Sequence, residues 1–118
     1  MFWTILITIL SLISGDSFSD VSIINIAGKD KIVHFVFYFG FATVWFLYNL
    51  SKTKEKKYQK IFIFSVSYGI LMELCQAWFT TARTADWLDI VANTTGALFG
   101  LAILYYLINV KKNKFLSN

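Results

Sequence analysis

The sequence predicts an all-α integral membrane protein, a single domain over residues 1–118 built as a bundle of four transmembrane helices. Three observations predict this fold class. Hydrophobic residues make up 57% of the 118 residues and charged residues only 15%, whereas soluble domains carry about 25% charged residues. A soluble chain this short would have too few polar residues to cover 12 Phe, 6 Tyr and 4 Trp. The apolar residues fall into four long runs, and no proline interrupts them.

A helix needs about 20 residues to cross a hydrocarbon core that is about 30 Å thick. The four predicted spans cover about residues 2–15, 32–50, 61–79 and 87–110. The first is short, and it reaches across only with Ser14 and Gly15 included and with local thinning of the bilayer. A cleaved signal peptide is the alternative. We expect the helix to be retained, because residues 1–3 carry no basic side chain and Ile13-Ser14-Gly15 is a poor cleavage site.

Basic residues predict the orientation, because cytoplasmic loops of membrane proteins are enriched in Lys and Arg. Eight of them flank the second, third and fourth spans on one side: Lys52, Lys54, Lys56, Lys57, Lys60, Lys111, Lys112 and Lys114. The other side holds only Lys29, Lys31 and Arg83. We therefore expect the Lys-rich loop and both termini to be cytoplasmic. No stripe of interleaved basic and aromatic residues appears, so a nucleic-acid partner is not expected.

Sequence motifs for common cofactors are absent from the chain. A single cysteine excludes an internal disulfide and any paired-cysteine zinc motif. The sequence also contains no P-loop, no G-x-G-x-x-G and no G-x-S-x-G. We therefore predict no cofactor.

Polar residues inside the predicted spans are expected to have a hydrogen-bonding or ion-pairing partner or a functional role, because placing such groups in a membrane is energetically unfavourable. Glu73 lies about twelve residues, or roughly 18 Å, from the cytoplasmic start of its span, and so in the outer half of the bilayer. An unpartnered carboxylate there costs about 3 kcal/mol by some scales. We expect Glu73 to be protonated, paired with Arg83 or His34, or wetted by a cavity. Gln76 shares its helix face.

The start of the fourth span shows a helical pattern with steps of three and four residues. Its members are Asp86, Asp89, Asn93, Gly96 and Gly100. They share one helix face, polar at its outer end and small at its inner end. The two glycines form a G-x-x-x-G pair that permits close approach of another helix, and we expect Gly69 of the third span to be the surface they meet. Such packing would bring together the predicted site residues Lys31, His34, Glu73, Gln76, Arg83, Asp86, Asp89 and Asn93.

Several interpretations of this cluster stay open. It could bind an amphiphile's polar head, with Lys31, Arg83 and His34 facing phosphate. It could be an acid–base site, with Glu73 or Asp89 and His34 as the catalytic candidates. It could be a structural polar core without a ligand, in which Asp86 only caps the fourth helix. A metal site from His34, Glu73 and Asp89 is geometrically possible, but no H-x-x-x-H or H-E-x-x-H pattern is present, and we predict none.

Three segments resemble the motifs of the VanZ-like family. Asp30–Phe35 resembles its D-K-x-x-H-F opening, and Gly69–Gln76 resembles its G-x-x-x-E-x-x-Q motif. Arg83–Gly96 resembles its R-x-x-D-x-x-D-x-x-x-N-x-x-G motif, and Gly100 completes the G-x-x-x-G end. The resemblance covers about residues 30–100, with the motifs in order in three successive spans.

The resemblance implies a four-helix protein of the bacterial inner or plasma membrane, with the eight residues above as its site. The family takes its name from a protein linked to resistance to the glycopeptide teicoplanin. Our leading expectation is a protein that binds a membrane lipid or lipid-linked precursor, such as a prenyl phosphate, from the outer leaflet. The alternatives are a membrane-embedded hydrolase or transferase and a structural membrane subunit, and we favour a protein that is not an enzyme. The sequence does not indicate an oligomeric state. The short first span, with no basic residue before it, departs from the family pattern.

Overall fold

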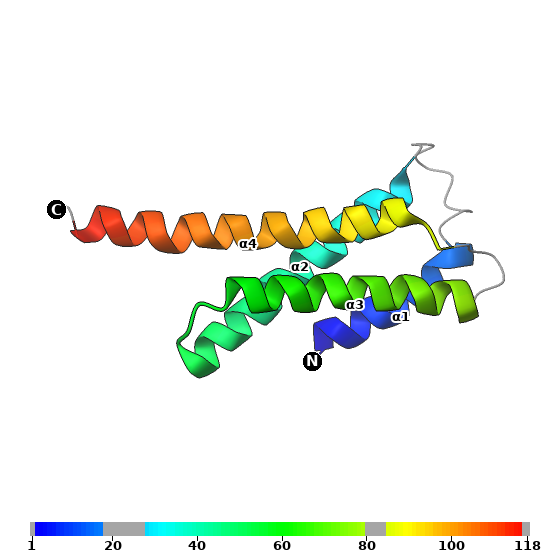
Figure 1. The fold of residues 1–118 in the computed structure, drawn as a ribbon, viewed down its shortest axis with the longest axis horizontal. Coiled ribbons are helices and arrows are strands. Elements are labelled where there is room, and N and C mark those ends of the chain that lie inside the picture. Colours follow the sequence, from blue (N-terminus) through cyan, green and yellow to red (C-terminus); the bar gives the residue numbers. More distant parts are fainter. Residues whose placement is uncertain (1, 18–27, 80–84, 117–118) are drawn as a thin grey trace.

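The computed structural model describes residues 2–17, 28–79 and 85–116, and all regular structure in this part is helical (Figure 1). The four helices are α1 (Phe2–Ser17), α2 (Lys29–Thr53), α3 (Tyr58–Phe79) and α4 (Trp87–Leu116). The predicted all-α fold class is therefore confirmed.

Three of these helices are long and apolar enough to cross a membrane: α2, α3 and the segment Trp87–Val110 of α4. The first helix, α1, has 16 residues, which corresponds to about 24 Å at 1.5 Å per residue. That is less than the hydrocarbon thickness of about 30 Å. A fourth span therefore stays a prediction.

The observed helices extend beyond the predicted spans because a helix continues through the headgroup region with polar residues. Helix α2 begins at Lys29, directly after Gly28, whose φ of 91° lies in the left-handed region that favours glycine. It ends at Thr53, and the next residue, Lys54, is also left-handed; its backbone N–H donates to the carbonyl of Leu50 at 3.0 Å. This bond satisfies one of the carbonyls that a helix end leaves without an intrahelical partner.

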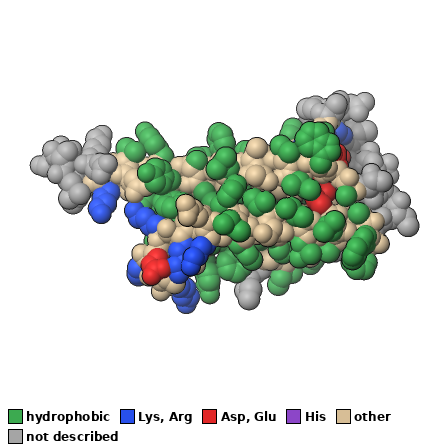
Figure 2. Space-filling model, in the orientation of Figure 1, with side chains coloured by type: hydrophobic (Ala, Val, Ile, Leu, Met, Phe, Trp, Pro, Cys, Tyr) green, Lys and Arg blue, Asp and Glu red, His purple; other side chains and the backbone are tan. Residues whose placement is uncertain are grey.

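The two ends of the bundle differ in charge. The carboxyl ends of α1 and α3 lie at the same end as the amino ends of α2 and α4 (Figure 1). The opposite end holds the loop of residues 54–57 and the carboxyl end of α4, and lysines gather there (Figure 2). The two lysine-rich segments thus lie at one end of the molecule.

The most extensive helix contact in the described part joins α2 and α4, and the glycines of α4 explain it. A Cβ at Gly96 would lie 2.2 Å from the backbone oxygen of Phe35, and one at Gly100 would lie 2.8 Å from that of Phe39. The expectation that these glycines meet Gly69 was wrong. The face of α4 that carries its glycines packs against the backbone of α2. Gly69 on α3 instead leaves space for the side chain of Asn93.

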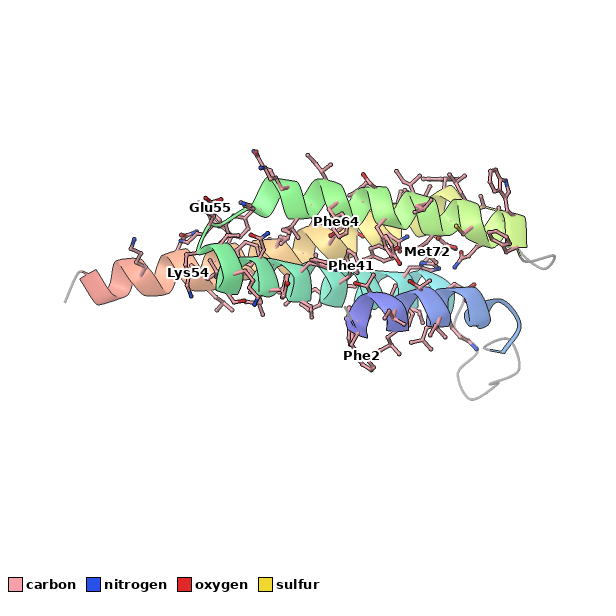
Figure 3. All side chains as sticks on the ribbon, turned by 90° about the horizontal axis from the view of Figure 1, so that it is seen from below. Phe2, Phe41, Lys54, Glu55, Phe64 and Met72 are labelled. Atoms are coloured by element: carbon pink, nitrogen blue, oxygen red, sulfur yellow. The ribbon has the colours of Figure 1, made fainter. Side chains whose placement is uncertain are left out.

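Aromatic rings fill much of the interior between α2 and α3. Phe41 is fully buried, and its ring stacks on that of Tyr68 with centroids 5.0 Å apart. Met72 also lies inside, whereas Phe2 points away from the bundle on α1 (Figure 3). Large apolar side chains on all four helices face outward, which suits a lipid environment.

Helix α1 packs against α2 and α3 through polar as well as apolar contacts. The Trp45 Nε1–H donates to the Thr4 hydroxyl at 3.0 Å, and the Thr8 hydroxyl bonds to that of Tyr68. Ile7 is buried. These contacts join the short helix to the spans that carry the polar residues described next.

Candidate functional site

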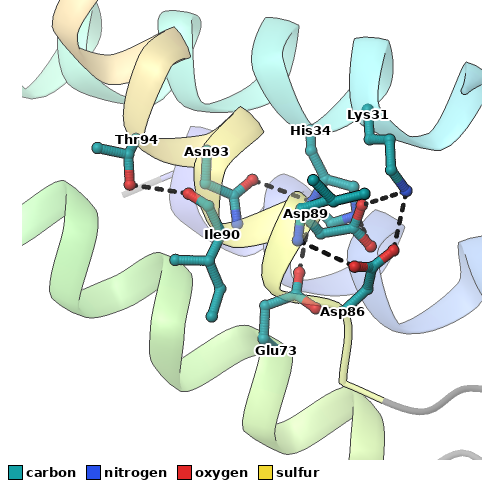
Figure 4. A network of polar contacts seen from close by, with 9 residues as sticks. Lys31, His34, Glu73, Asp86, Asp89, Ile90, Asn93 and Thr94 are labelled. Atoms are coloured by element: carbon teal, nitrogen blue, oxygen red, sulfur yellow. Dashed lines mark hydrogen bonds and ion pairs between the residues drawn. The ribbon is translucent and has the colours of Figure 1, made fainter.

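Polar side chains are buried inside the apolar helices, close to the end where α2 and α4 begin (Figure 4). They include His34 on α2, Glu73 on α3, and Asp89 and Asn93 on α4, with exposed fractions of 6%, 2%, 5% and 1%. Burial of such groups is unfavourable unless they form hydrogen bonds or ion pairs. Their partners therefore decide what the cluster can do.

His34 lies at the centre of the cluster. Its Nδ1 donates a hydrogen bond to the Asn93 amide oxygen at 3.0 Å. Two carboxylates approach the same ring: Glu73 Oε1 lies 3.6 Å from Nδ1, and Asp89 Oδ2 lies 3.7 Å from Nε2. Both distances exceed those of ordinary hydrogen bonds. The imidazole therefore lies between two acidic groups that it contacts electrostatically.

Lys31 closes the cluster on the side nearer the start of α2. Its ammonium donates to Asp86 Oδ2 at 3.0 Å and to Asp89 Oδ1 at 3.2 Å. Lys31 precedes His34 by three residues, so both side chains lie on one face of α2. Asp89 consequently contacts Lys31 with one oxygen and approaches His34 with the other. The side chains of Lys31 and Asp86 remain 34% and 37% exposed, so this pair is the part of the described cluster that reaches the surface.

Asp86 has a second role at the start of α4. Its Oδ1 accepts a hydrogen bond from the backbone N–H of Leu88 at 2.9 Å. This is the geometry of a helix N-cap. Asp86 therefore caps α4 with one oxygen while it holds Lys31 with the other.

Two predicted site residues remain to be placed. Gln76 is buried one turn after Glu73 on α3. Arg83 lies outside the described residues. The structure thus brings together six of the predicted side chains: Lys31, His34, Glu73, Asp86, Asp89 and Asn93.

The sequence analysis did not include Tyr38 among the candidate site residues. Tyr38 is buried one turn after His34 on α2 and lies beside Gly69. Its hydroxyl oxygen and the Asn93 Nδ2 have no hydrogen-bond partner within the described ranges. The spacing of four residues between His34 and Tyr38 was the available signal, because it places both on one helix face.

Acidic side chains outnumber basic ones in the described part of the cluster. Three carboxylates (Glu73, Asp86 and Asp89) face Lys31 and His34 in the described part of the site. One ligand atom from each of His34, Glu73 and Asp89 lies within 4.8 Å of the others. These three residues are therefore the ones that could hold a metal ion.

Comparison with known proteins gives one match. A sequence model of the family described as VanZ/LLP1 matches residues 2–109. Searches of curated proteins and of solved structures found no match. The matched range covers most of the chain and includes all six clustered residues. Together with three helices able to cross a membrane, it shows that the chain is a membrane protein that belongs to the VanZ/LLP1 family.

Proposed function

We propose that this protein binds the polar head of a cell-envelope amphiphile, a prenyl phosphate or a lipid-linked cell-wall precursor. One observation carries the proposal: His34, Glu73, Asp89 and Asn93 are buried together inside helices that are apolar enough to cross a membrane. Ionisable residues at such positions usually mark a functional site. Gln76 and Arg83 are further candidates for contact with the ligand.

A purely structural core fits the cluster less well than a ligand site does. Tyr38 Oη and Asn93 Nδ2 are buried donors without a hydrogen-bond partner in the described part of the chain. A buried donor left in this way costs about 1–3 kcal/mol. An oxygen of a bound headgroup, or of a water beside it, would satisfy both donors.

The position of the cluster suits a ligand that arrives from the membrane. Trp78 and Trp87 are exposed near the end where α4 begins, as is typical of residues at the membrane–water interface. If the lysine-rich end faces the cytoplasm of a bacterial cell, the cluster lies in the outer half of the plasma membrane. An acyl or prenyl chain would then lie along the apolar helix surfaces while its head enters beside Lys31.

Lipid analysis of the purified protein tests this proposal. The protein and its Glu73→Gln variant are extracted from bacterial membranes in mild detergent, and bound lipids are identified by mass spectrometry. We expect the unmodified protein to retain a phosphate-bearing prenyl lipid, and the variant to retain at least about tenfold less. Cells that produce the variant should also be as sensitive to teicoplanin as cells without the protein.

Glu55→Gln is the matched control, because it makes the same change at the opposite end. Glu55 is exposed and pairs with Lys57 at 2.9 Å, and that hydrogen bond holds the pKa of Glu55 below its ordinary value. This variant should retain lipid like the unmodified protein. Equal lipid in the Glu73→Gln variant would refute the proposal. A lower yield of folded Glu73→Ala protein with unchanged lipid would favour a structural subunit.

A hydrolase or transferase is the second candidate, favoured by the position of His34 between two carboxylates at 3.6 and 3.7 Å. A histidine beside a carboxylate is a common arrangement for proton transfer. The protein reconstituted with a prenyl diphosphate would then release phosphate, and His34→Gln would abolish the release. A binding protein leaves that lipid unchanged.

A further inference from the structure

We propose that His34, Glu73 and Asp89 bind a divalent metal ion of the Zn²⁺ or Mn²⁺ class. The inference rests on the proposed function only for the role of the ion, which is to hold a lipid phosphate. Binding of the ion itself follows from the geometry and the hydrogen bonds of the cluster.

The geometry brings three ligand atoms close enough for one ion. An imidazole nitrogen of His34 and one carboxylate oxygen from each of Glu73 and Asp89 lie within 4.8 Å of one another. Ligands that share an ion at about 2.0–2.2 Å are separated by roughly 3–4.4 Å, which is close to the spacing of these three atoms. The three residues come from three different helices, which is why no local sequence motif indicates the site.

The hydrogen bond of His34 prepares its ring for a metal ion. Because the Asn93 amide oxygen can only accept, Nδ1 carries the proton in this 3.0 Å contact. In the neutral ring Nε2 is then the atom with the lone pair, and Asp89 Oδ2 lies 3.7 Å from it. A proton or a metal ion between these two atoms would relieve the repulsion of their lone pairs. Metal-binding histidines commonly donate their other N–H in this way.

Two buried donors indicate an additional oxygen next to the ion. Asn93 Nδ2 and the Tyr38 ring both lie beside Gly69, where an added Cβ would be 3.2 Å from each. Gly69 precedes Glu73 by one helical turn. Neither Asn93 Nδ2 nor Tyr38 Oη has a hydrogen-bond partner within the described segments. Metal sites with three protein ligands keep a position for water or substrate, whose oxygen these donors could bind.

The ion would also explain how an acidic site accepts a phosphate. Lys31 alone carries a permanent positive charge in the described cluster, and two carboxylates, those of Asp86 and Asp89, contact it. A divalent ion adds two positive charges and coordinates phosphate oxygens directly. One imidazole with two carboxylates suits Zn²⁺ or Mn²⁺ better than Ca²⁺ or Mg²⁺, which prefer oxygen ligands alone.

The single histidine of the chain permits a direct test. The full chain is purified without a polyhistidine tag, stripped with a chelator and titrated with Mn²⁺, and the bound ion is observed by electron paramagnetic resonance. We expect one Mn²⁺ per chain with a pulsed-resonance coupling to ¹⁴N of an imidazole, which only His34 can supply, and displacement by Zn²⁺. Mn²⁺ bound without this coupling, or no bound Mn²⁺, overturns the proposal without the use of any variant.

Variants locate the other two ligands. Glu73→Gln and Asp89→Asn should each weaken Mn²⁺ binding at least about tenfold, and His34→Gln should abolish the ¹⁴N coupling. Glu55→Gln, exposed at the opposite end, should bind Mn²⁺ like the unmodified protein. Unchanged Mn²⁺ affinity in both carboxylate variants would overturn the proposed ligand set.

A lipid experiment separates this inference from the proposed function. Binding of farnesyl phosphate is measured in detergent with added Zn²⁺ and with excess chelator. Binding that requires Zn²⁺ supports both proposals. Binding that persists in chelator overturns the role of the ion and leaves the proposed function intact. Mn²⁺ binding with the ¹⁴N coupling, but no farnesyl phosphate binding, refutes a prenyl phosphate as the ligand and leaves the metal site intact.

Discussion

Asp89 connects Lys31 and His34. One of its oxygens accepts from Lys31 at 3.2 Å, and the other lies 3.7 Å from His34 Nε2. Its own position follows from the cap of α4, since Asp86 starts the helix and the Asp89 N–H donates to the Asp86 carbonyl at 3.0 Å. A substitution that changes the charge of one of these residues therefore changes the electrostatic environment of the others.

Lys31→Met should have opposite effects on the two proposed ligands. Removal of the ammonium takes away a positive charge that attracts phosphate, so farnesyl phosphate binding should weaken by about two- to fivefold, in line with about 0.5–1 kcal/mol for a partly exposed ion pair. Mn²⁺ binding should stay the same or become tighter, because the site becomes more negative. Equilibrium dialysis and paramagnetic resonance measure the two affinities. Lys112→Met, an exposed change at the opposite end, is the control, and parallel weakening of both ligands would contradict this account.

Helix packing determines whether the cluster forms at all. Gly96 and Gly100 allow α4 to touch the backbone of α2 at Phe35 and Phe39. His34 directly precedes Phe35, so this contact sets its distance from Asp89 and Asn93 on α4. Gly69 has a corresponding steric role on α3, where it leaves space for the side chain of Asn93.

Gly96→Ala should therefore damage both stability and the site. The added Cβ would lie 2.2 Å from the Phe35 carbonyl oxygen, so the two helices must separate. We expect the free energy of unfolding to fall by about 1–3 kcal/mol, as for other overpacked cores, and Mn²⁺ binding to weaken. Denaturant titration in detergent micelles measures the first effect. Leu98→Ala, on the outward face of α4, should change neither, and a fully stable Gly96→Ala protein would refute the close α2–α4 contact.

Helix α1 should be present in the mature protein. Its Thr4 and Thr8 side chains bond to Trp45 and Tyr68, and Ile7 is buried against the bundle. Removal of the helix would leave these groups of α2 and α3 without partners. Intact mass spectrometry of the protein from its native membrane should show α1 still attached. A mass that corresponds to a chain starting at Asp16 would instead identify residues 1–15 as a signal peptide.

The molecule as a whole separates its charges between its two ends. Lysines lie around the loop of residues 54–57 and along the carboxyl end of α4, while the acidic cluster lies at the other end (Figure 2). This asymmetry is the basis of the orientation that we propose, because positively charged loops stay in the cytoplasm.

Reporter fusions test the orientation. A reporter inserted at Lys56 and one placed after Asn118 should both show cytoplasmic activity, because two spans separate them. A reporter at Ala85, directly before α4, should show activity on the outer side and serves as the positive control for that side. Opposite readings at Lys56 and Ala85 would place the polar cluster in the cytoplasmic half of the membrane and would refute an outer-leaflet ligand.

The sequence analysis recognised much of this architecture because the membrane restricts the choices. Apolar runs of the required length predict helices, since a lipid-embedded backbone must satisfy its own hydrogen bonds. Helical spacing also placed Asp86, Asp89 and Asn93 on one face. The partner of the α4 glycines was predicted wrongly, because spacing within one helix does not tell which neighbour its small face meets. The position of Arg83 stays a prediction.

The sequence by itself thus determined the helices, their apolar surfaces and the polar residues that they carry into the membrane, because these depend on composition and on local periodicity. Only the tertiary structure decided that His34 lies between Glu73 and Asp89 and donates to Asn93, a residue 59 positions further along the chain. Such contacts depend on how closely α2, α3 and α4 approach one another. That approach is set by Gly69, Gly96 and Gly100 acting against neighbouring helices, a property of the packed bundle that no single segment contains.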